Sequence, residues 1–262
     1  MATKCAHCPL RRSNLFVPHS DDDTKFMQRF KVGELVIEPG TPMLIEGSNS
    51  PQLFTALRGM GLRYKTLENG RRQVLNFVFP GDFIGLQAAV MGEMQHSVEA
   101  TTPMTLCVFN RAEFWHFFKT HPERAFDLTW LAAVEEHFMG ETLATVGQRD
   151  ATERVAWALV KIMQRGEALG LVKNHTMPLH YRQQDLADAL GLSLVHTNKT
   201  LAKLRDASAP ADVARIRSRH RYRPPAPRAR PRDGRGRWCC RVRCGAPARR
   251  SARPPEAAGS PR

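Results

Sequence analysis

Residues 182–205 have the sequence RQQDLADALGLSLVHTNKTLAKLR, and this stretch predicts two short helices joined by a tight turn. The first helix is expected over 183–190, with its apolar residues on one buried face, namely Leu186, Ala187 and Leu190. Gly191 follows where the turn requires a residue that tolerates a positive φ. Ser193 is a good N-cap for the second helix. The pattern is typical of a helix-turn-helix that docks in the major groove of DNA, whereas an ordinary helical hairpin with a solvated polar face is the alternative.

The start of the second helix carries the polar residues that can contact DNA. The N-terminal part of such a helix meets the base edges. Asn can form two hydrogen bonds with adenine, and Lys can reach guanine or a phosphate. The candidate contacts at this end are His196, Thr197, Asn198 and Lys199, and we include Ser193 among them.

Charge is distributed unevenly along the chain. The 262 residues contain 39 Lys and Arg against 25 Asp and Glu, a net charge of +14. Residues 207–262 hold 16 Arg, no Lys and three acidic residues, so residues 1–206 carry a net charge of only +1. The tail shows no helical or strand period, and we expect no packed core there. It is predicted to be a disordered Arg- and Pro-rich arm that holds DNA phosphates, or the product of a shifted coding frame near Asp206.

An antiparallel β-barrel or sandwich is predicted for residues 31–121, after an N-terminal segment 1–30 that contains a Cys5-Ala6-His7-Cys8 motif. Short apolar stretches alternate there with turn signals such as Pro39-Gly40 and Pro80-Gly81. Strands are expected over 34–37, 42–45, 53–57, 62–67, 73–79 and 104–109. Asn69-Gly70 suits a type I′ turn between two of them.

The apolar period becomes helical after Arg111. A long helix is expected from Pro122 to about Val146, because Pro and an acidic residue favour the first turn. Leu131, Val134 and Phe138 recur at three- and four-residue steps, enough for one seam of a two-stranded coiled coil. Residues 122–148 are therefore predicted to be a dimerisation helix, and the alternative is a helix that covers its own barrel. A hinge at Gly147-Gln148 would then lead into a helix-turn-helix DNA-binding domain, 149–206, which begins with a helix over 151–165.

This order of elements resembles the Crp/Fnr family. The matching segments are 58–85 with Gly81-Asp82-Phe83-Ile84-Gly85, the run Ala151-Thr152-Glu153-Arg154-Val155-Ala156, residues 178–184 and the helix-turn-helix. The resemblance covers residues 1–206. It implies an α+β fold with a β-roll sensor domain, a dimerisation helix and a winged helix-turn-helix. It also implies a homodimeric transcription regulator that binds a palindromic site in double-stranded DNA and has RNA polymerase as a candidate partner.

The resemblance also assigns DNA contacts. The base-contacting positions of the family fall on Val195, Asn198 and Lys199, and we expect His196 and Asn198 to recognise bases. Phosphate contacts, which position a protein without specifying sequence, are expected from Arg182, Gln183 and Lys203. The family has a β-hairpin wing directly after the second helix. Residues 207–210, Ala-Ser-Ala-Pro, lack its usual apolar pair and glycine, so the wing is expected to be missing.

The sensed signal is left open by departures from the family pattern. Cyclic-nucleotide binders carry a Glu and an Arg-Ser pair where this chain has Leu86-Gln87-Ala88-Ala89 and His96-Ser97, so cyclic AMP is not the expected ligand. Oxygen sensors of the family hold a [4Fe–4S] cluster with four thiolates. Cys5, Cys8 and Cys107 match three of these positions, and a third N-terminal cysteine is absent. An iron–sulfur cluster, a thiol switch and unreactive free thiols are the alternatives.

Other classes find little support in the sequence. No catalytic Ser/His/Asp or Cys/His set and no phosphate-binding glycine loop is evident, so we expect no enzyme. No apolar run is long enough for a membrane span, and the N-terminus does not resemble a signal peptide. The few cysteines of residues 1–206 favour a reducing compartment, the cytoplasm. The rival hypothesis is a redox, iron–sulfur or thiol sensor that acts through protein partners and has impaired DNA binding.

Overall fold

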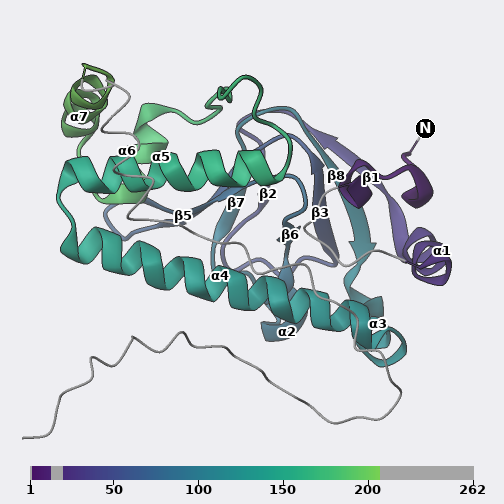
Figure 1. Ribbon diagram of the computed structural model, residues 1–262. Helices are drawn as coiled ribbons and strands as arrows, with labels where there is room; N and C mark the ends of the chain where they lie inside the picture. Colours follow the sequence, from purple (N-terminus) through teal and green to yellow (C-terminus); the bar gives the residue numbers. More distant parts are fainter. Residues whose placement is uncertain (1, 13–19, 207–262) are drawn as a thin grey trace, which may run out of the picture. The chain divides into compact units, whose positions relative to one another are not determined.

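The computed structural model describes residues 2–12 and 20–206. The predicted basic arm, the frame shift and the missing wing concern residues 207–262, outside the described residues. Within the described part, antiparallel sheets are followed by long helices and a helix-turn-helix (Figure 1). The predicted α+β fold, with a β-roll and a helix-turn-helix, is confirmed.

The β-roll consists of two four-stranded antiparallel sheets. The first has the strand order β1 (Lys31–Ile37), β8 (Met104–Asn110), β3 (Gln52–Arg58) and β6 (Phe83–Ile84). The second has the order β2 (Pro42–Leu44), β7 (Ser97–Ala100), β4 (Gly61–Thr66) and β5 (Arg72–Val78). Inward-facing residues of both sheets, among them Phe54, Val78, Val98 and Leu106, form one buried cluster. This cluster is the main core of the roll.

The turn between β4 and β5 differs from the sequence prediction. A type I′ turn needs positive φ at both central residues, but Asn69 does not adopt it and Gly70 does, at +77°. The backbone N–H of Gly70 donates to the carbonyl of Leu67 at 2.8 Å, and that of Leu67 donates to Arg71 at 2.8 Å. The predicted type I′ turn is therefore wrong, because three residues separate Leu67 from Arg71 and only the last of them needs the left-handed region.

Short helices beyond those predicted from the sequence surround the roll. They are the 3₁₀ helices η1 (Cys5–His7), η2 (Pro9–Arg12) and η3 (Arg111–Glu113), and the α-helices α1 (Asp21–Phe30), α2 (Leu86–Met91) and α3 (Phe114–Thr120). α1 begins with a capping box in which Ser20 and Asp23 bond each other's backbone N–H groups. That Ser-x-x-Asp spacing was the signal by which α1 could have been found.

Two long helices follow the roll. α4 (Pro122–Gln148) and α5 (Ala151–Ala168) lie side by side, and the ring of Phe138 stacks on Trp157 with centroids 5.7 Å apart (Figure 1). α4 ends at Gln148, and Asp150 caps the start of α5 through a capping box with Glu153. The hinge predicted at Gly147-Gln148 is wrong, because both residues belong to α4 and the break falls at Arg149, whose backbone is extended.

The helix-turn-helix comprises α6 (Gln183–Leu190) and α7 (Leu194–Asp206), with the bounds expected for its first helix. A second hydrophobic cluster joins this domain to the β-roll. It combines Leu62, Val74, Phe77 and Phe79 of the roll with Val155, Trp157, Ile162, Tyr181, Leu186 and Leu190. The hydroxyl of Tyr181 donates to the carbonyl of Val78 at 3.3 Å, and the amide of Gln73 donates to the carbonyl of Ala189 at 3.4 Å. The first helix of the motif therefore packs directly on β5.

Candidate functional site

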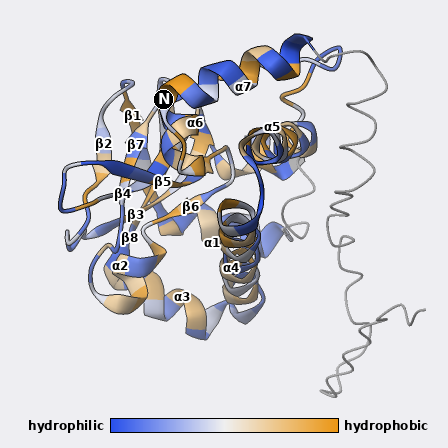
Figure 2. Cartoon of the chain, turned by 90° about the vertical axis from the view of Figure 1, so that its left-hand side faces the viewer, coloured by the Kyte–Doolittle hydropathy of each residue, from blue (hydrophilic) through white to orange (hydrophobic). Residues whose placement is uncertain are grey.

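The start of α7 is built around a side-chain cap. The hydroxyl of Ser193 accepts a hydrogen bond from the backbone N–H of His196 at 3.2 Å, as an N-cap does. Gly191, at φ +64°, makes the turn that precedes it. Val195, His196, Asn198 and Lys199 are exposed, while Leu201 and Leu204 pack against the core. Figure 2 shows hydrophilic and hydrophobic residues alternating along α7. One face of this helix thus presents an imidazole, an amide and an ammonium group to solvent.

Thr197 lies on the other face of α7. Its side chain is 0% exposed, and that of Thr200 is 4% exposed. A buried hydroxyl cannot reach a base edge, so the prediction that Thr197 contacts DNA is wrong. The spacing of the polar residues could not indicate which of them face inward, because the orientation of α7 is set by its packing on α5 and α6.

The predicted phosphate contacts lie at the start of α6 and further along α7. The guanidinium of Arg182 donates to the carboxylate of Asp185 at 2.8 and 3.1 Å, yet the Arg182 side chain stays 67% exposed. Gln183 and Lys203 are also exposed. Arg182 thus lies exposed at the start of α6, in a capping box with Asp185 whose carboxylate pairs with its guanidinium.

Between the β-roll and α4 lies a network of charged side chains. The guanidinium of Arg63 on β4 donates to the carboxylate of Glu135 on α4 at 2.6 Å, and the amide of Asn76 on β5 donates to the same oxygen at 2.8 Å. Burial by itself would raise the pKa of Glu135, but Arg63 and Asn76 outweigh it and lower the pKa below its usual range. The anion that Arg63 binds is therefore a carboxylate of the same chain.

Two of the residues expected at a cyclic-nucleotide site, Gln87 and Ser97, accept hydrogen bonds from backbone N–H groups of the chain, and a third, His96, is uncharged. Burial, supported by the nearby Arg63, lowers the pKa of His96 to about 4, so its imidazole is neutral near pH 7. The hydroxyl of Ser97 accepts from the backbone N–H of Glu46 at 3.0 Å, and the amide oxygen of Gln87 accepts from that of Gln95 at 3.0 Å. A cyclic phosphate needs a cationic partner, and a neutral His96 is none. These residues do not fit a cyclic nucleotide.

Cys5, Cys8 and Cys107, the three cysteines of the described part, are free thiols. Cys107 lies on β8 in a buried cluster, and Cys8 packs against that cluster. The ammonium of Lys31 lies nearby and donates to Glu34 at 2.6 Å and to the carbonyl of Thr3 at 2.8 Å. No group of three or more His, Cys, Asp or Glu among residues 2–12 and 20–206 has an arrangement that could hold a metal ion. The described thiols therefore do not fit an iron–sulfur cluster, which needs four ligands.

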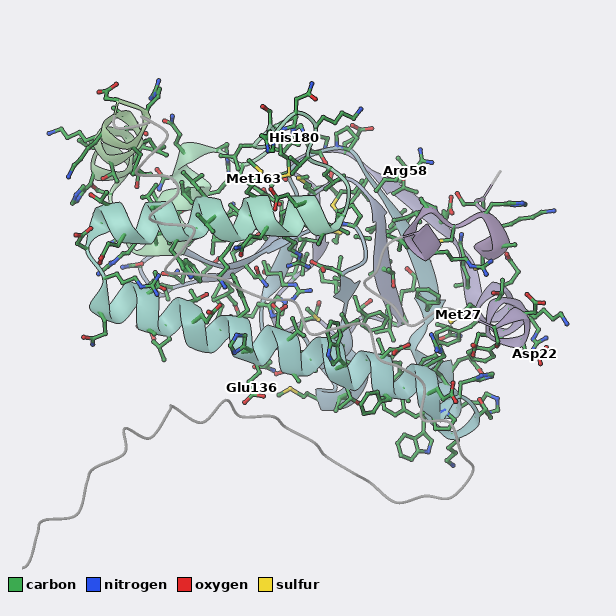
Figure 3. The ribbon with its side chains drawn as sticks, in the orientation of Figure 1. Asp22, Met27, Arg58, Glu136, Met163 and His180 are labelled. Carbon is green, nitrogen blue, oxygen red and sulfur yellow. The ribbon has the colours of Figure 1, made fainter. Side chains whose placement is uncertain are left out.

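α4 has an inner and an outer face, and the residues predicted to form a dimer seam lie on the inner one. Leu131, Val134 and Phe138 are half-buried, and Phe138 stacks on Trp157. At Phe138 this face of α4 is covered by α5 of the same protomer. The outer face exposes Phe126 and Leu143, which are 37% and 75% exposed. Glu136, labelled in Figure 3, points outward from the same face.

Comparison with known proteins agrees with this arrangement. Residues 29–121 match the family model of the cyclic nucleotide-binding domain. Residues 153–220 match that of the Crp-like helix-turn-helix domain, a match that continues past the described part of the chain.

Regulators of gene expression are among the relatives in sequence. The nitrogen fixation regulation protein FixK of Bradyrhizobium diazoefficiens is 31% identical over 201 residues, which cover 76% of this chain and 83% of that protein. The transcriptional activator protein FnrL of Cereibacter sphaeroides is 25% identical over 77% of this chain and 82% of that protein. The solved structure of FixK2 from Bradyrhizobium japonicum has the same fold, with a TM-score of 0.61 at 24% identity over 66% of this chain and 84% of that one.

A β-roll joined through a long helix to an exposed helix-turn-helix defines a class of DNA-binding transcription regulators. The chain belongs to the Crp/Fnr family of that class.

Proposed function

We propose that the chain works as a homodimer that binds a two-fold symmetric DNA site, with α7 of each protomer in a major groove. The observation that carries this proposal is the exposed face of α7, where His196, Asn198 and Lys199 follow the Ser193 cap. Dimer symmetry places two such helices about one DNA turn apart and requires a palindrome. Val195, Ser193, Arg182, Gln183 and Lys203 are proposed as the flanking contacts. A regulator that acts on chromosomal DNA, and not an enzyme, is expected to work in the cytoplasm.

The outer face of α4 is the proposed dimer interface. Phe126, Ala133, Gly140 and Gly147 recur every seven residues, with Thr129, Glu136 and Leu143 between them, as in the seam of a coiled coil. A Cβ atom added at Gly140 or Gly147 would meet nothing within 4 Å in the protomer. Inside a helix, each glycine lowers stability by about 1 kcal/mol relative to alanine. Within the protomer, no close contact requires the absence of a side chain at these two positions. Close approach of a second α4 supplies the reason for both.

The signal is proposed to be something other than a cyclic nucleotide. The guanidinium of Arg63 is already paired with the carboxylate of Glu135, so it is not available to a cyclic phosphate. A thiol sensor that acts through protein partners has less support. Burial raises the pKa of Cys5, and raises that of Cys107 to about 11, so little of either thiol is in the reactive thiolate form. No helix in the described ranges has the length and apolarity to cross a bilayer.

Selection and sequencing of genomic DNA fragments on the full 262-residue chain tests the proposal. The selection is run at about 0.15 M salt, under reducing and anaerobic conditions, because salt sets the share of non-specific binding. Enrichment of a shared two-fold symmetric site is the expected result. Recovery of DNA without a shared motif would contradict the proposal and would indicate that the Arg-rich residues 207–262 dominate binding.

A further inference from the structure

One arginine links the end of α4 to the end of α6. The Nε of Arg154 on α5 donates to the carbonyl of Arg149, the residue that follows α4, at 2.8 Å. Its Nη1 donates to the carbonyl of Leu190, the last residue of α6, at 3.2 Å. Carbonyls at the end of a helix lack partners within the helix and lie at its negative end, where a cation is favoured. A single guanidinium therefore stabilises two helix ends at once.

Arg154 reaches out from a fixed turn. It is the fourth residue of α5, whose first turn is closed by the capping box of Asp150 and Glu153. The backbone N–H of Arg154 donates to the carbonyl of Asp150 at 2.9 Å. The side chain is half-buried, and both of its hydrogen bonds run to backbone carbonyls of the chain. Its position is thus fixed by the first turn of α5 and by the carbonyl of Arg149.

The turn of the helix-turn-helix lies against the same point. A Cβ atom added at Gly191 would lie 3.6 Å from Cγ1 of Val146 on α4 and 4.0 Å from Nη1 of Arg154. α4, the first turn of α5 and the link between α6 and α7 therefore meet around one guanidinium. The direction of α7 relative to α4 depends on this junction, because α7 begins directly after it.

We propose that Arg154 is a positioning residue that fixes the half-site spacing which the dimer accepts. The inference rests on the proposed function, in which two α4 helices define the dimer axis and two α7 helices bind the half-sites. One added base pair turns a half-site by about 35° around the DNA axis, so a dimer tolerates it only if α7 can change direction relative to α4. Because Arg154 binds the carbonyls of both Arg149 and Leu190, α7 has little freedom to change direction relative to α4.

The test compares spacing preference among variants of the full chain. A palindrome selected by the wild-type protein is remade with one base pair fewer and one more at its centre, and apparent Kd values are measured for all three DNAs. For each DNA with an altered spacing, its Kd is divided by the Kd for the preferred spacing. For Arg154→Gln and Arg154→Lys we expect this ratio to fall by about threefold or more relative to the wild-type protein. Arg154→Lys retains the charge but replaces the two separate donor atoms, Nε and Nη1, by one nitrogen. It is the variant to use if Arg154→Gln does not fold.

A matched control separates positioning from loss of affinity. Lys199→Ala removes an exposed group of α7 and should weaken binding to all three DNAs by the same factor. Arg154 variants that also weaken all three equally would overturn the inference and leave Arg154 a purely structural role. Failure of the wild-type protein to select any two-fold site would instead refute the proposed function, and the inference with it.

Discussion

Asn198 is exposed on α7 between two buried threonines, Thr197 and Thr200. For Asn198→Ala we expect relaxed base preference at one position of each half-site, at a cost of about 1–3 kcal/mol per half-site, because the amide can form two hydrogen bonds with adenine. Selection on the variant and binding to single-base variants of the site measure this. Lys203→Ala is the control, since loss of a phosphate contact should weaken binding to all sequences alike. The same uniform loss for Asn198→Ala would contradict a base-specific role.

His96 gives a pH-dependent prediction. Its pKa lies near 4 in the folded chain and near 6.5 in the unfolded one, mainly because burial disfavours the charged imidazole. A depressed folded pKa contributes stability that is fully present above pH 6.5 and is lost as the pH falls towards 4. In His96→Gln, the decline of the unfolding free energy over this range should be smaller by up to about 3 kcal/mol. Urea unfolding of both proteins at several pH values tests this, and parallel pH profiles would contradict it.

Residue by residue, local chemistry was predictable and orientation was not. The Ser193 cap and the Gly191 turn follow from backbone needs that a short stretch of sequence displays, and both are present. That Thr197 faces inward depends on how α7 packs against α5, which that stretch does not contain. The pairing of Arg63 with Glu135 joins residues far apart in the sequence, so no motif could indicate it.

At the scale of one element, the outer face of α4 gives a prediction about assembly. Leu143→Glu puts a charge into the proposed seam next to Glu136 and should weaken the dimer at least about tenfold, because like charges in a closed interface are costly. Sedimentation equilibrium measures the dimer dissociation constant. Val36→Glu on β1 is a matched control, since Val36 and Leu143 are 66% and 75% exposed. Equal dissociation constants for both variants would refute the outer seam.

The bounds of α4 were nearly predicted, and its faces were not. Apolar or small residues recur at three- and four-residue steps on both sides of this helix, so the pattern allows two seams. The stacking of Phe138 on Trp157 favours the outer seam, and Trp157 belongs to another helix. A helical period thus indicates that a helix is amphipathic, but it does not indicate which element packs against the apolar face.

At the scale of the whole molecule, the roll and the DNA-binding domain are joined by an ion pair. Asp82, in the turn before β6, pairs with Arg165 on α5, whose side chain is 34% exposed. Arg165→Met leaves the carboxyl group of Asp82 buried without that partner. We expect a loss of about 2–3 kcal/mol of unfolding free energy, below the cost of breaking a fully buried pair because of this exposure.

A double-mutant cycle with Asp82→Asn completes this prediction. The double variant should lose less stability than the sum of the two single variants, because no charge is then left unpaired. Urea unfolding monitored by fluorescence measures all four proteins. Additive losses would mean that Asp82 and Arg165 do not interact energetically.

The packing of α6 on β5 has a consequence for building chimeras. Swapping sensors between regulators assumes that a DNA-binding domain is a separable module carried on a hinge. Here Phe77 and Phe79 of the sensor and Tyr181 of the DNA-binding domain share one cluster of rings. A DNA-binding domain transplanted onto another sensor would expose the apolar surface that packs on β5 here. The facing surface of β5 would have to be transplanted with it. The functional boundary between sensor and effector runs through the middle of a hydrophobic core, not along a linker.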